Sequence, residues 1–333
     1  MEKLRIGLIG CGGIMNHHVN GILTFDDAKI VAVADPHKDR TDAMQKRTGA
    51  EKAYSSHKEL FENEDKLDAV YICVEPTAHT DIEETAIARN LPFMVEKPMT
   101  LNMAQGEAIA KAVTEKGLVT AVGFQDRYLD LTARIKKELE DMQVGMVYGS
   151  WIGGVPQVWW WMRKDTCGGQ LMEQNIHLVD MLRYFFGEAD SVFATNGRGL
   201  VNTKEFPDHL PAYDTDDSSS AMFIFKSGVV VNLMSACFVK WNGNPIRNGL
   251  TIIGREKSLE YALRDSLTVY TSQTQKRYNR VADQSVSHDR AFLDAVRSGD
   301  PTAVLSPYAD GFKSLLLTDA ANRSMETGTL VKL

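Results

Sequence analysis

The sequence predicts an α/β domain with a doubly wound parallel sheet, followed by an α+β domain built on a mostly antiparallel open sheet. The chain has 333 residues, more than one hydrophobic core usually holds, so two domains are expected. Its first third alternates short β-branched runs with longer helical patterns, as βαβ units do. Later strand patterns are joined by short turns, as in antiparallel sheets. We place the domains at 1–123 and 124–333.

The elements of the first domain follow from local patterns. Met15, Val19 and Ile22 recur at helical spacing and indicate an amphipathic helix after the first strand. Asn90 and Gly117 follow two further helical patterns and suit left-handed C-terminal caps. The predicted strands span 4–9, 30–34, 52–54, 69–74, 93–95 and 119–124, and the two capped helices span 79–89 and 102–116.

The second domain begins with an amphipathic helix and contains a strongly apolar helix over 169–186, which Gly187 ends. Two more helices close the chain. The strands expected in this domain span 147–153, 218–226, 229–237, 250–253, 258–262 and 267–271.

Composition and charge exclude several classes of protein. The formal net charge is −7 and no basic block stands out, so nucleic acid is not an expected partner. No apolar run reaches the ~18 residues of a membrane span, and the early first strand leaves no room for a signal peptide. The cysteines lack C-x-x-C spacing, which favours reduced thiols in the cytoplasm. These cysteines are Cys11, Cys73, Cys167 and Cys237.

A glycine-rich turn joins the first strand to the first helix. Glycines at 10 and 12 let the backbone approach a pyrophosphate, which the helix N-terminus also attracts, as in Rossmann dinucleotide sites. Met15 replaces the usual third small residue and is expected to push the helix slightly away from the strand. A turn without a ligand remains the alternative on this motif alone. The expected cofactor contacts here are Gly10, Gly12, Gly13, Ile14 and Met15.

Asp35 ends the second strand and points to the identity of the dinucleotide. A carboxylate at this place can accept hydrogen bonds from the adenosine ribose hydroxyls and repels a 2′-phosphate. We therefore expect NAD rather than NADP, although Arg40 leaves a smaller opening for NADP. The alternative is an acidic residue that merely ends a strand.

Polar groups also follow the later strands of the first domain, at 74–76, 96–98 and 124–125. In a doubly wound sheet, ligands bind beyond the carboxyl ends of the strands, so these groups are expected to converge on one edge. Lys97 lies there before Pro98, whose restrained backbone, a candidate cis peptide, would fix its direction. A surface lysine in a turn is the competing interpretation.

The apolar helix over 169–186 has a polar stripe of Glu173, His177, Asp180 and Tyr184 at helical spacing. Such a stripe must be solvated, internally paired or part of a pocket, because unpartnered buried polar groups cost several kcal/mol. A lone histidine would be better explained as a satisfied core residue, but three polar companions favour a site. Glu173 and His177 could ligate a metal, but no convincing third ligand exists, so no metal is expected.

Three consecutive tryptophans, at 159–161, precede this helix. Core or subunit packing is one explanation. Stacking of Trp160 on the C–H faces of a sugar, with Arg163 and Lys164 reaching its hydroxyls, is the other.

Together, the glycine loop, Glu96-Lys97-Pro98 and the segment Gly168-Gly169-x-x-x-Glu173-x-x-x-His177-x-x-Asp180 resemble the glucose-fructose oxidoreductase/inositol dehydrogenase (Gfo/Idh/MocA) family. The resemblance implies that Lys97 and His177 flank a sugar or polyol carbon at the nicotinamide as an acid/base pair. It implies that Glu96 contacts the nicotinamide-side ribose. Further implied cofactor contacts are Pro76, His79 and Gln125, and implied substrate contacts are Arg127 and Asp180. We also expect Val74 to contact the cofactor and Glu173 to contact the substrate.

This sequence departs from the family pattern in three places. Glu173 replaces the usual aspartate, Gln125 replaces a common asparagine, and Val74-Glu75-Pro76 stands where Thr-Pro is typical. These differences bear on the shape of the substrate more than on the type of reaction.

The expected activity is hydride transfer between a sugar, polyol or inositol hydroxyl carbon and NAD. One rival is a glycosidase that oxidises its substrate transiently, eliminates the leaving group and returns the hydride. Another is a non-enzymatic dinucleotide-sensing regulator, which would have no reason to keep both Lys97 and His177. Apolar residues on both faces of the strand over 218–226 indicate that both sides of the second domain's sheet are covered, one of them by a second subunit. The family resemblance implies that the assembly is a homodimer or homotetramer.

Overall fold

The structure is a computed structural model that describes residues 2–202, 204, 206–240 and 248–333. The chain divides into two compact units. The first comprises the residues up to Tyr128 together with Asp283–Phe312, and the second comprises Leu129–Ala282 and Lys313–Leu333. No helix among the described residues is long and apolar enough to cross a membrane.

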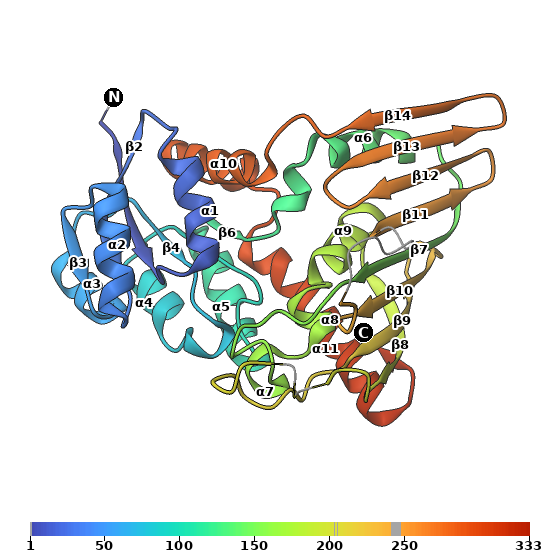
Figure 1. The fold of residues 1–333 in the computed structure, drawn as a ribbon. Helices are drawn as coiled ribbons and strands as arrows, with labels where there is room; N and C mark the ends of the chain where they lie inside the picture. Colours follow the sequence, from blue (N-terminus) through green and yellow to red (C-terminus); the bar gives the residue numbers. More distant parts are fainter. Residues whose placement is uncertain (1, 203, 205, 241–247) are drawn as a thin grey trace. The chain divides into compact units, whose positions relative to one another are not determined.

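Within the described residues, the first unit contains a six-stranded sheet in the order β3-β2-β1-β4-β5-β6, with all neighbouring strands parallel (Figure 1). This confirms the predicted doubly wound sheet, whose order reverses between β1 and β4. Its strands are β1 (Leu4–Ile9), β2 (Ala28–Ala34), β3 (Lys52–Tyr54), β4 (Ala69–Ile72), β5 (Phe93–Val95) and β6 (Thr120–Val122).

The connecting helices carry the predicted apolar stripes and caps. Met15, Val19 and Ile22 are buried against the sheet in one core cluster. Asn90 and Gly117 adopt the expected left-handed conformation, with φ of 51° and 59°. The helices are α1 (Gly13–Ile22), α2 (Lys38–Thr48), α3 (His57–Asn63), η1 (Pro76–Ala78), α4 (Ile82–Ala88), α5 (Met103–Lys116) and η2 (Gln125–Tyr128).

Helix α10 (Gln284–Ser298) and η4 (Pro301–Ala303) belong to the first unit although they lie far along the chain. Phe292 and Leu293 of α10 are fully buried in the same core cluster as α1. We expected this segment in the second domain, because no local pattern signals a contact made across so many residues.

In the second unit, the described residues form a nine-stranded sheet in the order β14-β13-β12-β11-β7-β10-β9-β8-β15. Only the β7–β10 pairing among them is parallel, so the predicted mostly antiparallel sheet is confirmed. Strands β8, β14 and β15 were not predicted. The strands are β7 (Val144–Ile152), β8 (Ala189–Gly197), β9 (Ser218–Phe225), β10 (Val230–Ala236), β11 (Gly249–Gly254), β12 (Lys257–Ala262), β13 (Ser266–Thr271), β14 (Gln275–Asn279) and β15 (Val331–Lys332).

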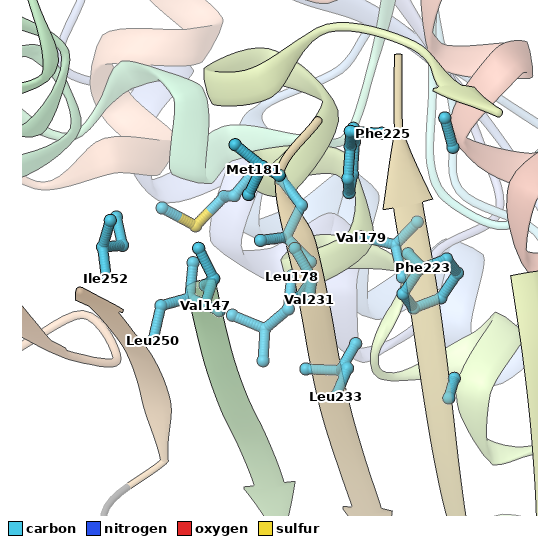
Figure 2. Packing of buried hydrophobic residues seen from close by; sticks show 14 of the residues in the cluster. Val147, Leu178, Val179, Met181, Phe223, Phe225, Val231, Leu233, Leu250 and Ile252 are labelled. Atoms are coloured by element: carbon cyan, nitrogen blue, oxygen red, sulfur yellow. The ribbon is translucent and has the colours of Figure 1, made fainter. Parts of the chain in front are cut away.

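Helix α9 covers one face of this sheet. Figure 2 shows its Leu178 and Val179 lying over Val147, Val231 and Phe223 of the strands, and all five are fully buried. The helices that contribute to this unit are α6 (Asp130–Leu139), α7 (Lys164–Cys167), α8 (Gln170–Glu173), α9 (Ile176–Phe186) and the greater part of α11 (Tyr308–Thr327).

The predicted single helix over 169–186 is wrong in one respect, because it is two helices, α8 and α9. The Asn175 amide bonds to the Gln170 carbonyl at 3.4 Å, an i→i−5 bond that widens the turn between them. Glu173 and His177 therefore lie on different helices rather than one regular turn apart.

Candidate functional site

The glycine loop between β1 and α1 forms an open cradle. Gly10 has a φ of +86°, and a Cβ there would lie 2.4 Å from the Cys73 carbonyl oxygen, so only glycine fits. A Cβ at Gly12 or Gly13 would meet no atom within 4 Å. Gly12 precedes α1 without a side-chain cap, which leaves the first amides of the helix open to an anion.

The two residues that follow the loop face different ways. Ile14 is 37% exposed at the start of α1, whereas the Met15 side chain is fully buried in the core. The Ile14 side chain therefore lies open to solvent beside the loop, and the Met15 side chain packs in the core.

Asp35 follows β2 and joins that strand to the glycine loop. Its two carboxylate oxygens accept the backbone amides of Cys11 and His37, each at 2.8 Å. Each oxygen keeps a lone pair that a ribose hydroxyl can use. Burial and the Asp35 charge raise the pKa of the Cys11 thiol to about 12, so this thiol stays neutral. Arg40 is exposed in the first turn of α2.

The segment after β4 brings a buried histidine to the same edge of the sheet. Val74 is half-buried and Pro76 is buried. The Nδ1 atom of His79 lies 2.5 Å from Oε1 of Glu83, and both side chains are almost fully buried. Its Nε2 atom has no partner among the described residues, although it is buried.

Glu96 and Lys97 follow β5, and the Lys97–Pro98 peptide bond is cis as the sequence suggested. Glu96 is 4% exposed and Lys97 is half-buried. A Cβ at Gly123 would lie 2.4 Å from the Glu96 carboxylate, so glycine makes room for it. Gln125, the first residue of η2 after β6, is buried.

These observations fit a bound dinucleotide. The cradle, the uncapped helix and Asp35 lie on the β1–β2 side of the sheet reversal, and His79, Glu96 and Gln125 follow the strands on its other side. That is the division between the two nucleotide halves in a doubly wound sheet. The unsatisfied His79 Nε2 supplies a polar atom for the second half.

Arg127 has internal partners that the sequence did not indicate. Its Nη1 donates to the Leu305 carbonyl at 2.5 Å, and its Nη2 pairs with Asp310 at 2.7 Å. The side chain is 3% exposed, so its guanidinium is engaged in holding the segment before α11.

In the second unit, Glu173 and His177 are both buried, at 1% and 6% exposure. The His177 ring stacks on Trp151 of β7 at 6.0 Å between centroids, and Arg264 lies 5.6 Å from the Trp151 ring. Trp151 was not among the residues expected at the site. Period-two alternation could have found it, because Trp151 lies on the same face of β7 as the core residue Val147.

Asp180 is held in a buried polar network. The Ser314 hydroxyl donates to it at 2.7 Å and accepts from Arg183 at 2.8 Å, and Arg183 also pairs with Glu188. Asp180, expected to contact substrate, thus has a hydrogen-bond partner on α11.

The tryptophan segment contributes one stacked pair. Trp160 and Trp161 lie 5.5 Å apart with an angle of 21°, and Trp161 donates to Gln170 at 3.1 Å. Trp159 is 47% exposed. The ring of Trp160 is half-buried.

Arg163 and Lys164, expected to reach sugar hydroxyls, have acidic partners at the surface. Arg163 pairs with Asp165 at 3.0 Å, and Lys164 pairs with Glu326 at 3.1 Å. Exposed pairs of this kind are weak, so a ligand can compete for either cation.

Asn175, between α8 and α9, is a second residue that the sequence analysis missed. It is fully buried, and neither polar atom of its side chain has a partner among the described residues. The described part of the chain contains no group of three His, Cys, Asp or Glu residues able to hold a metal ion.

Comparison with known proteins assigns both halves of the chain to one family. Residues 4–124 match the model of the oxidoreductase family with an NAD-binding Rossmann fold, and residues 142–260 match the Gfo/Idh/MocA C-terminal domain. Myo-inositol 2-dehydrogenase of Thermotoga maritima is 28% identical, over 99% of this chain and 98% of its own. The NAD(+)-dependent scyllo-inositol 2-dehydrogenase of Bacillus subtilis is 25% identical, over 100% and 97%.

Solved structures show the same fold. Levoglucosan dehydrogenase in complex with NADH and levoglucosan has a TM-score of 0.86 at 21% identity, covering 99% of both chains. An oxidoreductase from Agrobacterium radiobacter has a TM-score of 0.83 at 19% identity, covering 99% of this chain and 98% of its own. On the two family models together, this chain belongs to the Gfo/Idh/MocA family of oxidoreductases.

Proposed function

We propose that this protein is an NAD-dependent dehydrogenase that oxidises a hydroxyl carbon of an inositol, a polyol or a sugar. The observation that carries the proposal is Lys97, half-buried after β5 beside Glu96, on the edge of the sheet that also presents the glycine cradle. The names of the two inositol dehydrogenase relatives, which align over nearly the whole chain, support this class of substrate.

In the proposed reaction, His177 accepts the proton of the substrate hydroxyl and Lys97 donates a hydrogen bond to the same oxygen. The oxidised nicotinamide, when bound, supplies the acceptor for the hydride. Stacking on Trp151 holds the plane of the His177 ring, so its basic nitrogen has a fixed direction.

The remaining polar residues of the second unit bind and select the substrate in this proposal. Glu173 orients His177 or accepts a neighbouring hydroxyl, and the Trp160 ring offers a stacking face. Arg163 and Lys164 exchange their weak surface pairs for substrate hydroxyls. We assign Arg127 and Asp180 to positioning, because both already have internal partners.

We further propose that the cofactor is NAD rather than NADP. The Asp35 carboxylate is fixed by two backbone amides at the end of β2, where it repels a 2′-phosphate. The relatives include the NAD(+)-dependent scyllo-inositol enzyme, and also an NADP(+)-dependent D-xylose 1-dehydrogenase of Haloferax volcanii.

The deciding experiment mixes the protein with NAD and a panel of inositols, polyols, sugars and glycosides, and follows NADH absorbance and bond cleavage together. Oxidation predicts NADH formation with an inositol or sugar. Release of sugar from a glycoside without net NADH would instead show a redox-neutral glycosidase. NAD binding without turnover on any member would favour a regulator.

We also propose that the open face of the second unit's sheet joins subunits of a homodimer or homotetramer. Met146 and Tyr148 of β7 and Met234 of β10 are more than 40% exposed on that face. Tyr148 and Met234 also line a depression of about 520 Å³. Exposed apolar sheet faces of this kind mark interfaces. Sedimentation should find an oligomer that Tyr148→Lys dissociates, and a monomeric wild-type protein would contradict the proposal.

The cell compartment that we infer is the cytoplasm, where thiols stay reduced. All four cysteines are buried and free. Burial raises the pKa of Cys167 to about 12 and that of Cys237 to about 11, which keeps both thiols in their unreactive neutral form.

A further inference from the structure

A histidine in the first unit binds two buried carboxylates from distant parts of the chain. Nδ1 of His18, on α1, lies 2.7 Å from Asp289 of α10, and its Nε2 lies 3.1 Å from Oε1 of Glu96. The three side chains are exposed by at most 5%. Breaking such a buried pair leaves an uncompensated charge, so this arrangement is costly to disturb.

Two glycines make room for the two carboxylates. A Cβ at Gly21 on α1 would lie 2.9 Å from Oδ2 of Asp289, and one at Gly123 would lie 2.4 Å from Glu96. Glycine inside a helix costs about 1 kcal/mol relative to alanine, so Gly21 is present at some expense of stability. Glycine at these two positions therefore leaves the space that the two buried carboxylates occupy.

Hydrogen bonding to both carboxylates requires a proton on each ring nitrogen of His18. Burial alone would lower the pKa of His18, but the charge of Asp289 and a contribution from Cys73 raise it well above its ordinary value. The other groups packed around the ring are Tyr71 and His288. Burial and the His18 charge lower the pKa of His288 to about 3, so His288 stays neutral.

The Glu96 carboxylate has a second partner besides His18. Glu96 keeps one lone pair on each oxygen after its bonds to the His18 ring and to the Lys97 amide at 3.1 Å. A carboxylate with two free lone pairs and a fixed direction is suited to a pair of adjacent hydroxyl donors.

We propose that His18 is a positioning residue: anchored by Asp289, it holds the Glu96 carboxylate in the orientation that receives the two hydroxyls of the nicotinamide-side ribose. This rests on the proposed contact between Glu96 and that ribose. Asp289 acts on the cofactor only through His18. The Glu96 carboxylate is thus preorganised, so its orientation costs no free energy when the cofactor binds.

Cofactor fragments test this without any sugar substrate. In His18→Gln, which cannot donate to both carboxylates from opposite sides, the Kd values of NAD and of ADP-ribose should rise about tenfold, as for one lost charge-assisted bond. The Kd of AMP, which lacks the second ribose, should stay within about twofold and shows that the unit is folded. Calorimetric titration gives all three values.

Asp289→Asn keeps the shape of the side chain but removes its charge, so it should shift the NAD affinity in the same direction by about threefold. Because Asp289 acts through His18, the double variant should bind NAD no more weakly than His18→Gln alone. His57→Gln removes a matched histidine–aspartate pair, formed with Asp81 at 2.9 Å near the surface, and should change none of the affinities.

Two outcomes overturn the proposal. Unchanged NAD affinity in His18→Gln, with only a lower melting temperature, would make the residue purely structural. Equal weakening of NAD and AMP would show a general disturbance of the unit. Glu96→Gln tests separately whether Glu96 contacts the ribose at all. Unchanged ADP-ribose binding in that variant would show that this contact does not exist. A protein that passes these tests yet oxidises no sugar would contradict only the proposed function.

Discussion

At the scale of single residues, local sequence rules can identify candidate site residues when their place at the end of a strand puts them on the ligand edge of the sheet. Lys97, Glu96 and Asp35 each follow a strand of the parallel sheet and lie on its ligand edge. Arg127 and Asp180 follow no such rule, and both are engaged by residues on or just before α11.

Replacement of Lys97 by alanine should abolish most of the activity while sparing the cofactor. We expect kcat to fall by about 10²- to 10⁴-fold, the usual contribution of a positioned proton-transfer group. The Kd of NAD should stay within about twofold. Stopped-flow kinetics and titration check both values, with Lys111→Ala, on an exposed pair with Glu115, as the control. Near-normal turnover in Lys97→Ala would remove this residue from the mechanism.

Replacement of Asp35 by serine should change cofactor preference. Without the carboxylate, the repulsion of a 2′-phosphate is lost, so the ratio of kcat/KM for NADP to that for NAD should rise about tenfold or more. The lost bonds to Cys11 and His37 should also lower stability. Asp39→Ser, in the first turn of α2, is the matched control. An unchanged ratio would place the ribose elsewhere.

At the scale of elements, periodicity identified most helices and strands, but it failed where one turn is irregular. The helix over 169–186 is interrupted by the single wide turn at Asn175, which no composition rule announces. The contact between α1 and α10 is likewise tertiary, since His18 and Asp289 are 271 residues apart.

The close approach of α1 and α10 makes Gly21 a sensitive position. Alanine should favour the helix by about 1 kcal/mol, yet its Cβ would lie 2.9 Å from Asp289. We expect a net loss of about 1–3 kcal/mol in the free energy of unfolding, because overpacking forces α10 to shift. Urea unfolding measures this loss, with His17→Ala on the exposed side of α1 as the control. A stabilised Gly21→Ala protein would show that the two helices separate freely.

At the scale of the whole molecule, stability is linked to pH through groups that titrate differently in the folded and unfolded chain. His288 is buried, and its ring lies 4.7 Å from the Tyr128 ring in a tilted arrangement. Burial and the charge of His18 lower the pKa of His288 to about 3. The unfolded chain binds a proton at this histidine below about pH 6.5, whereas the folded chain does not. The contribution of His288 to the free energy of unfolding is therefore fully present at neutral pH, and it is lost as the pH falls from 6.5 towards 3.

His288→Phe should flatten this dependence. Between pH 7 and pH 5 the wild-type protein should lose about 2 kcal/mol more of its free energy of unfolding than the variant does. Denaturant titrations at several pH values give the free energy of unfolding of both proteins. Contributions from other titrating groups are common to both and cancel when the two curves are subtracted. Parallel curves for the two proteins would contradict a neutral His288 in the folded state.

The sequence by itself determined the doubly wound sheet, the glycine cradle, the left-handed caps at Asn90 and Gly117, and the strand-end places of Asp35, Glu96 and Lys97. Each depends on backbone preferences and spacing within a few residues, which a sequence displays directly. Only the tertiary structure decided that α10 joins the first unit, that Trp151 stacks on His177, and that His18 bridges Asp289 and Glu96. Those contacts join distant segments, and their free energy comes from burial and charge pairing that appear only once the core is packed.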